Sequence, residues 1–247
     1  MNPAPSVTIV VIGAGRLGRV LTRALRTAGF NVLGPLRREQ SMPAADIALL
    51  CVPDAAIAAV AFVARPHVRL VGHLSGATGL NDADFSIHPL QTFTGSETPD
   101  VFHGVGAAID GRNDDDREVA TELALTLGMN PFTVTDRAGY HAAASFASNF
   151  VLTVLDAAEQ LANAAGVENP RDMLAPLVRR TVDNWQRQGA AEALTGPIAR
   201  GDDATVARQR AASTGYTELF DALAAATREI ADRRNPDTQN AEGEVRA

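Results

Sequence analysis

The chain has 247 residues with 22 basic and 29 acidic side chains, which give a formal net charge of -7 at pH 7. Hydrophobic residues make up 46% of it and charged residues 21%, a composition that excludes a mainly disordered protein. The acidic balance argues against a nucleic-acid or anionic-membrane surface, and the single cysteine excludes a disulfide scaffold. Because the sequence has no run of 18 apolar residues and no basic leader, we expect a cytoplasmic protein.

The first half of the chain alternates short apolar runs with helical patterns. Strands are expected at residues 7–12, 30–33, 46–52, 68–74, 86–88, 105–109 and 132–134, and helices at 19–28, 55–64 and 114–127. Strands that alternate with helices through short connections predict an α/β fold with a doubly wound, parallel Rossmann sheet.

Beyond residue 135 the pattern is helical throughout. Helices are expected at 140–165, 171–188 and 217–233, with a loop at 194–201. The sequence thus predicts a Rossmann domain at 1–135, an all-helical domain at 136–233 and a frayed polar tail at 234–247.

A glycine fingerprint directly follows the first strand and opens the first helix. It reads Gly13, Ala14, Gly15, Arg16, Leu17 and Gly18. The first glycine permits a tight turn, the second lets the backbone approach a pyrophosphate, and the third lets helix and strand pack closely. The helix N-terminus offers N–H groups to the phosphates. This context favours dinucleotide binding over a glycine-rich turn without a ligand.

The end of the second strand indicates which dinucleotide binds. NAD enzymes place an acidic residue there, whereas this chain has Arg37 and Arg38. Two guanidinium groups suit a 2′-phosphate, so we favour NADP over NAD; the alternative is a solvated basic turn. After the third strand, Val52 and Pro53 are expected to line the ribose, and Asp54 to cap the helix at 55–64.

Four segments carry a family resemblance: HLSGATGL at 73–80, SIHPLQTF at 86–93, YHAAASFASNF at 140–150 and LTGPIARGD at 194–202. Together they resemble the Rossmann-like proteins with a DUF2520 C-terminal domain. The N-terminal half also resembles prephenate dehydrogenase, pyrroline-carboxylate reductase and the 6-phosphogluconate dehydrogenase-like enzymes. The resemblance implies an NADP-dependent oxidoreductase and does not name a substrate.

The wider superfamily implies roles for single residues. Ser75 resembles the serine after the fourth strand, and His88 the histidine of the His-Pro pair after the next one. Asn149 resembles the polar residue that a long helix brings to the nicotinamide. Related hydroxyacid dehydrogenases carry a lysine where this chain has Ser145, so hydroxyacid chemistry is disfavoured and the proton-donor role moves to histidine.

The residue chemistry points the same way. His88 ends a strand, where an imidazole could donate a proton; its alternative role is a bond to a loop carbonyl. His141, Ser145 and Asn149 follow at intervals of four and are expected to share one helix face, either toward substrate and nicotinamide or in helix packing. Arg200 could clamp a carboxylate or lie on the surface. The five histidines lack the spacing of metal ligands.

We therefore expect an NADPH-dependent oxidoreductase that transfers hydride to a small carbonyl or imine in a cleft between the two domains. His88 would donate the proton, His141 and Asn149 would position the reactants, and Ser145 and Arg200 would bind substrate. The helical domain is expected to form a homodimer, as in related superfamilies. Two alternatives stay open, namely a non-catalytic NADP-binding sensor and a deazaflavin-dependent reductase.

Overall fold

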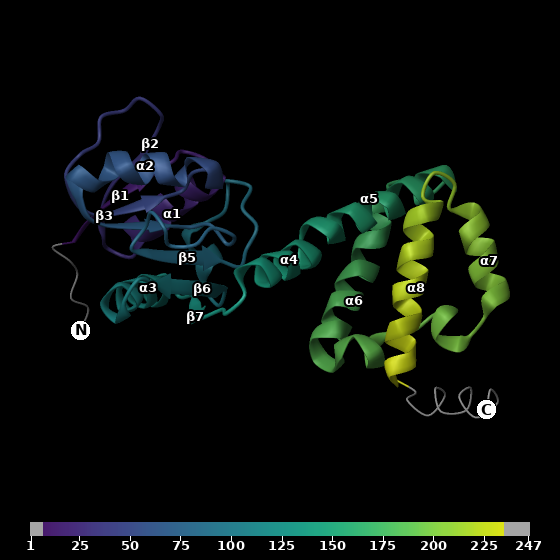
Figure 1. Ribbon diagram of the computed structural model, residues 1–247. Helices are drawn as coiled ribbons and strands as arrows, with labels where there is room; N and C mark the ends of the chain where they lie inside the picture. Colours follow the sequence, from purple (N-terminus) through teal and green to yellow (C-terminus); the bar gives the residue numbers. More distant parts are fainter. Residues whose placement is uncertain (1–6, 235–247) are drawn as a thin grey trace, which may run out of the picture. The chain divides into compact units, whose positions relative to one another are not determined.

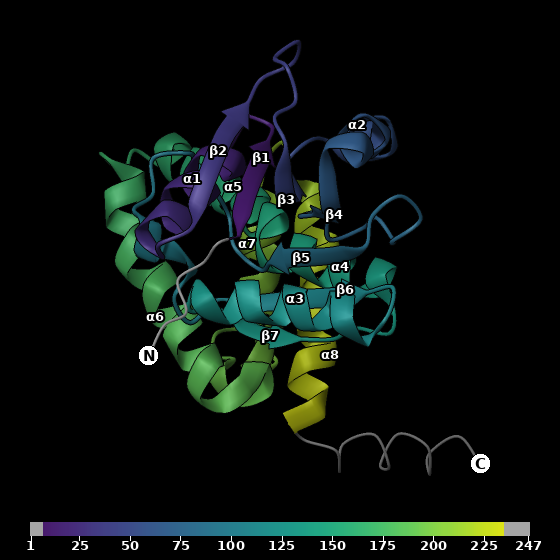
Figure 2. The ribbon, with the colours of Figure 1, turned by 90° about the vertical axis from the view of Figure 1, so that its left-hand side faces the viewer.

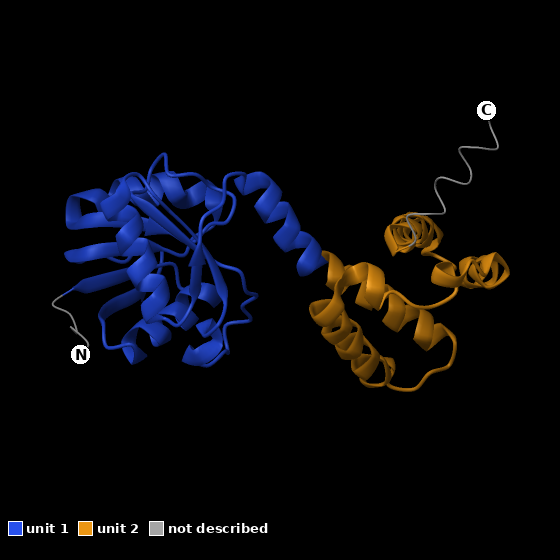
Figure 3. Ribbon diagram, turned by 90° about the horizontal axis from the view of Figure 1, so that it is seen from below, with its two compact units in different colours: residues 1–149 blue, residues 150–247 orange. Residues whose placement is uncertain are grey.

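The computed structural model describes residues 7–234 of the chain (Figure 1). It divides into two compact units, Met1–Asn149 and Phe150–Ala247, which Figure 3 colours blue and orange. The first unit extends to residue 149, beyond the boundary expected at 135, and therefore includes the helix at Arg137–Ala147. The expected tail at 234–247 lies outside the described residues, except for Arg234, which ends the last helix.

The first unit contains a seven-stranded sheet with strand order β2-β1-β3-β4-β5-β6-β7 (Figure 2). The strands are β1 (Thr8–Ile12), β2 (Asn31–Leu36), β3 (Ala45–Leu50), β4 (Val68–His73), β5 (Phe85–Pro89), β6 (Gly106–Gly111) and β7 (Asn130–Phe132). All neighbouring strands are parallel except β5 and β6, which are antiparallel. The α/β class and the Rossmann-like sheet are confirmed, and the sheet is mostly parallel, with the one antiparallel pair β5–β6 among the described strands. Residues 90–105 form only a 3₁₀ turn, Pro99–Phe102, and lack the crossover helix that usually makes neighbours parallel.

Apolar side chains alternate between the two faces of this sheet, which is why helices cover both. The helices of the unit are α1 (Arg16–Thr27), α2 (Ile57–Ala64), α3 (Asp114–Thr126) and α4 (Arg137–Ala147). Ile9 and Val11 of β1 pack in one core with α1 and α3, whereas Val10 and Ile12 pack in a second core with α2. Burial on both faces explains the continuous apolar run of β1. The strands β2, β1, β3, β4 and β5 are parallel to one another and therefore end at the same edge of the sheet.

The start of α2 differs from the expected cap. Asp54 opens a 3₁₀ turn, Asp54–Ala56, and its side chain caps neither that turn nor α2. The N-cap position of α2 is Ala56. The predicted role of Asp54 as a helix cap is therefore wrong, because the chain turns once more before the α-helix begins.

The second unit is helical, which confirms the all-helical C-terminal part. Its helices are α5 (Asn149–Ala164), α6 (Pro170–Ala193), α7 (Asp203–Ala212) and α8 (Thr217–Arg234). Sequence reasoning missed α7, although Asp202 marks its start by accepting a 3.0 Å bond from the Thr205 N–H. Within residues 7–234, no helix is both long and apolar enough to cross a membrane.

Candidate functional site

The glycine fingerprint forms a tight turn between β1 and α1. Gly13 has φ +111°, and a Cβ there would overlap the Cys51 carbonyl oxygen, while a Cβ at Gly18 would overlap the carbonyl oxygen of Gly13. In contrast, a Cβ at Gly15 would meet no atom within 4 Å. Two glycines thus close the turn, and the third leaves open space at the N-terminus of α1. These are the roles that a pyrophosphate site requires.

The other residues of the fingerprint frame this open position. Arg16 is exposed, Leu17 packs against the core, and the Ala14 carbonyl accepts a 2.9 Å bond from Nε of Arg19. The backbone of Gly95 approaches Arg16, since a Cβ at Gly95 would lie 3.5 Å from its Cα.

The ends of β2 and β3 meet at this turn. The Gly13 N–H donates to the Leu36 carbonyl over 2.9 Å, which places the exposed Arg37 and Arg38 directly after the contact. Cys51, at the end of β3, donates its N–H to the carbonyl of Ile12 over 2.7 Å, and Val52 and Pro53 follow. The tertiary structure therefore gathers the predicted cofactor residues at one edge of the sheet.

A cluster of two histidines and a tyrosine lies where β5 and α4 meet. Nδ1 of His88 is 2.7 Å from the hydroxyl oxygen of Tyr140, and the two rings pack edge to face. The rings of His88 and His141 have their centroids 6.0 Å apart. A Cβ at Gly76 would lie 2.9 Å from Nδ1 of either histidine. Only a glycine at position 76 leaves room for both imidazoles.

Burial and positive charge keep His88 neutral. Burial lowers its pKa most, the charges of His141 and Arg137 lower it further, and the pKa falls from 6.5 to about 4. Arg137 is itself held by Asp110 Oδ2 at 3.2 Å and by the Ser86 hydroxyl at 2.5 Å. Burial also raises the pKa of the Tyr140 hydroxyl. At neutral pH the pair therefore contains a neutral imidazole and a protonated phenol.

The loop after β4 is held by its own side chains. His73 is completely buried; Nδ1 accepts from the Ser75 N–H and Nε2 donates to the Gly79 carbonyl, both over 3.2 Å. The Ser75 hydroxyl oxygen accepts from the Thr78 N–H at 2.9 Å and donates to the Thr78 hydroxyl at 3.0 Å. His73 is thus a structural residue of this loop, and a contact of Ser75 with ribose or substrate stays a prediction.

The expected stripe of His141, Ser145 and Asn149 on one helix face is wrong. Ser148 leaves the helical conformation with φ -129° and ψ -73°, so α4 ends at Ala147 and Asn149 begins α5. Within α4, the Ser145 hydroxyl donates to the His141 carbonyl over 3.2 Å. Arg200 is exposed in a 3₁₀ turn of the second unit, Ile198–Arg200, and its role stays a prediction.

Sequence reasoning missed two residues of this site, namely Tyr140 of the cluster and Arg137 beside it. Tyr140 directly precedes His141 in a segment already singled out, so its hydroxyl was an available signal. Arg137 gave none, because its importance comes from contacts with β5 and β6 that the sequence order does not reveal.

Comparisons with known proteins agree with this architecture. The family model described as "Domain of unknown function (DUF2520)" matches residues 105–227. No curated protein sequence matches the chain. Among solved structures, a Bacteroides fragilis protein provisionally named an NADP oxidoreductase has a TM-score of 0.77 at 22% identity, covering 90% of this chain and 98% of its own. Protein TM1727 from Thermotoga maritima has a TM-score of 0.75 at 22% identity, with 91% and 99% covered.

A pyrroline carboxylate reductase from Plasmodium falciparum, solved with NADP bound, has a TM-score of 0.58 at 11% identity, with 92% of this chain and 98% of its own covered. At these identities the likeness shows a shared fold. Residues 105–227 therefore match the DUF2520 family model, and the chain shares the fold of these solved structures, as its sequence motifs predict.

Proposed function

We propose that the protein is an NADPH-dependent oxidoreductase that transfers hydride to a small carbonyl or imine. The observation that carries this proposal is that the glycine turn and His88 lie at the same edge of the sheet. The open position at Gly15 follows β1, His88 lies near the end of β5, and both strands belong to the parallel part of the sheet. Ligands of such sheets bind outside the carboxyl ends of the strands. The fold shared with a reductase solved with NADP bound supports the same reading.

The residues present fit a dinucleotide. The turn at Gly13 and Gly18 has no room for side chains, and the space beside Gly15 would take the pyrophosphate. Arg37 and Arg38 would hold the 2′-phosphate, and Val52 and Pro53 would line the ribose. When bound, the cofactor supplies the hydride chemistry, and the protein supplies orientation and proton transfer.

His88 is the residue we assign to proton transfer. Its imidazole stands beside Tyr140 and His141, it is neutral at pH 7, and one of its two nitrogens carries a proton. That proton can pass to a substrate oxygen or nitrogen as it becomes basic on accepting hydride. His141, Ser145 and Asn149 would position the substrate, and Arg200 would bind an acidic group on it.

Parallel fluorescence titrations with NADPH and NADH, followed by NADPH oxidation with a panel of small carbonyls and imines, test the function. Micromolar NADPH binding and turnover above the rate without substrate are expected. Preference for NADH would contradict the 2′-phosphate assignment. NADPH binding without turnover would favour the sensor alternative, and binding of neither nucleotide would favour the deazaflavin cofactor.

Replacing Arg37 or Arg38 with alanine should weaken NADPH binding about tenfold to a hundredfold and leave NADH binding unchanged. A bond to a charged group contributes about 1.5–3 kcal/mol, and only NADPH carries the 2′-phosphate. The matched control is Arg69→Ala, which removes an exposed arginine near the start of β4, at the edge of the sheet away from the proposed cofactor residues. Equal losses for both nucleotides would show that the two arginines do not read the 2′-phosphate.

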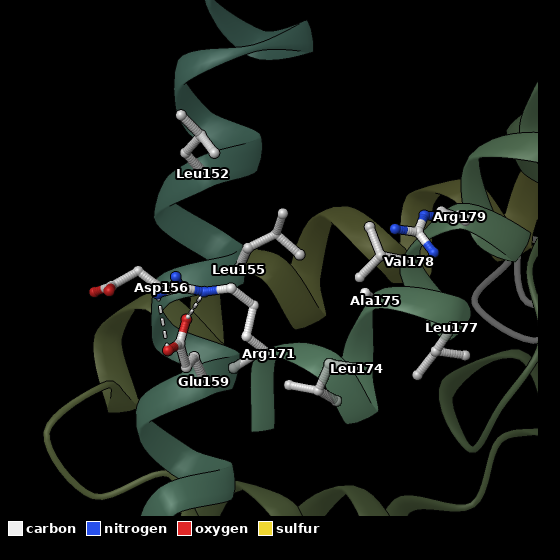
Figure 4. Close-up of a pocket in the computed structure, with 11 residues that line it drawn as sticks. Leu152, Leu155, Asp156, Glu159, Arg171, Leu174, Ala175, Leu177, Val178 and Arg179 are labelled. Carbon is white, nitrogen blue, oxygen red and sulfur yellow. Dashed lines mark hydrogen bonds and ion pairs between the residues drawn. The ribbon is translucent and has the colours of Figure 1, made fainter. Parts of the chain in front are cut away.

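We also propose that the second unit forms a homodimer. Its helices α5 and α6 expose large apolar side chains, with Leu152 66%, Leu177 64% and Trp185 60% exposed. Figure 4 shows leucines of both helices around a groove of about 590 Å³, beside the 3.0 Å ion pair of Arg171 and Glu159. Large exposed apolar side chains that gather on two helices around one groove are typical of an interface.

Sedimentation velocity tests the dimer. Leu152→Asp or Leu177→Asp should convert it to monomer, because each places a charge in the apolar surface. The control is Leu125→Asp, which alters a leucine of the first unit that is 57% exposed. A wild-type protein that sediments as a monomer at all concentrations would contradict the dimer.

A further inference from the structure

The contact between Tyr140 and His88 is a strong and well-held hydrogen bond. Its length of 2.7 Å lies at the short end for protein hydrogen bonds. The Tyr140 ring also packs edge to face on Phe132, with centroids 5.9 Å apart. Its two ring partners, His88 on β5 and Phe132 on β7, lie on elements other than α4. The hydroxyl is therefore fixed on the His88 nitrogen by packing on two sides.

The direction of this bond follows from what each group has to donate. A neutral imidazole carries one proton, on Nδ1 or on Nε2, and the phenol carries its own. A phenol is a much stronger acid than a neutral imidazole, and an imidazole nitrogen is a better acceptor than a phenol oxygen. The bond is therefore more favourable with Tyr140 as the donor. The geometry thus places the His88 proton on Nε2 and makes Nδ1 the acceptor.

The surroundings of His88 disfavour its charged form. Arg137 and His141 face it from α4 and His73 from β4, and these lower its pKa, while Asp54 from the 3₁₀ turn after β3 acts in the opposite sense. A neutral imidazole that only gave up its Nε2 proton would become an imidazolate, a stronger base than a phenolate. If a hydrogen-bond donor passes its proton to Nδ1 as Nε2 gives one up, no imidazolate forms and His88 stays neutral throughout.

We propose that Tyr140 is the proton source that His88 relays to the substrate, an inference that rests on the proposed function. As the substrate accepts hydride, the Nε2–H bond of His88 breaks and its proton passes to the substrate oxygen or nitrogen. The O–H bond of Tyr140 breaks at the same time, and its proton passes to Nδ1. His88 ends as the neutral Nδ1–H tautomer, and Tyr140 ends as a phenolate that water reprotonates. Tyr140 acts through His88 and is a positioning residue.

A nuclear magnetic resonance measurement of imidazole ¹⁵N shifts tests the bond without any substrate. His88→Gln identifies the His88 signals. Wild type is expected to hold its proton on Nε2, and Tyr140→Phe to lose this preference. The control is Tyr216→Phe, since Tyr216 is the second of the chain's two tyrosines and lies in the second unit. A proton on Nδ1 of His88 in the wild type would overturn the relay.

Kinetics with a compound that turns over give the second arm. Tyr140→Phe should lower kcat about tenfold to a hundredfold, leave KM for NADPH unchanged, and convert a two-proton solvent isotope dependence into a one-proton dependence. Tyr216→Phe should match wild type. Unchanged kcat in Tyr140→Phe would overturn the relay. If no compound turns over, the proposed function fails, and the tautomer measurement still decides whether Tyr140 donates to His88.

Discussion

Gly18→Ala should destabilise the first unit by about 3–5 kcal/mol, whereas Gly15→Ala should leave stability unchanged and abolish tight dinucleotide binding. The expected results differ because a methyl group would meet different surroundings at the two positions. At Gly18 it would overlap the carbonyl oxygen of Gly13, which is backbone and cannot move without opening the turn. At Gly15 it would enter space free of protein atoms within 4 Å.

The loss at Gly15 should appear as a roughly hundredfold weaker Kd for NADPH, because the methyl group takes the space of the pyrophosphate. Thermal unfolding measures the first effect and fluorescence titration the second, on the same two variants. Since Gly15 is not required by the turn itself, a binding loss there reports on the ligand alone. Wild-type NADPH affinity in Gly15→Ala would place the pyrophosphate elsewhere.

His88→Ala should lower turnover at least about a hundredfold, because it removes the group assigned to proton transfer. The KM for NADPH should change little, since the residues assigned to the pyrophosphate, the 2′-phosphate and the ribose follow β1, β2 and β3, whereas His88 lies on β5. The matched control is His67→Ala, which removes an exposed histidine at the start of β4. Unchanged turnover would remove His88 from the mechanism.

The same residue should make folding stability depend on pH, independently of any substrate. The folded pKa of His88 is about 4 and its ordinary value is 6.5, so between these values the unfolded chain binds more protons. Stability is therefore full above pH 6.5 and is lost as the pH falls toward 4. His88→Gln should flatten this part of the curve in chemical denaturation, while His67→Gln should not. A wild-type curve that is flat over this range would contradict the burial and the charges assigned to His88.

Much of the fold was predictable because its signals are local. The buried strand β1 reads as a continuous β-branched run, and the glycines that follow it occupy the positions of a pyrophosphate turn whatever surrounds them. The break between α4 and α5 was not predictable in this way. The periodicity continues through Ser148, and only the backbone angles there end the helix.

The sequence by itself determined the α/β class, the glycine turn and the identity of the residues that meet there, since neighbours along the chain specify each of them. Only the tertiary structure decided the antiparallel pairing of β5 and β6 and the partner of His88. Tyr140 and His88 are 52 positions apart, and they meet because β5 and α4 pack together. The proton chemistry of the candidate site depends on that contact, and contacts between distant segments arise from packing that no local pattern encodes.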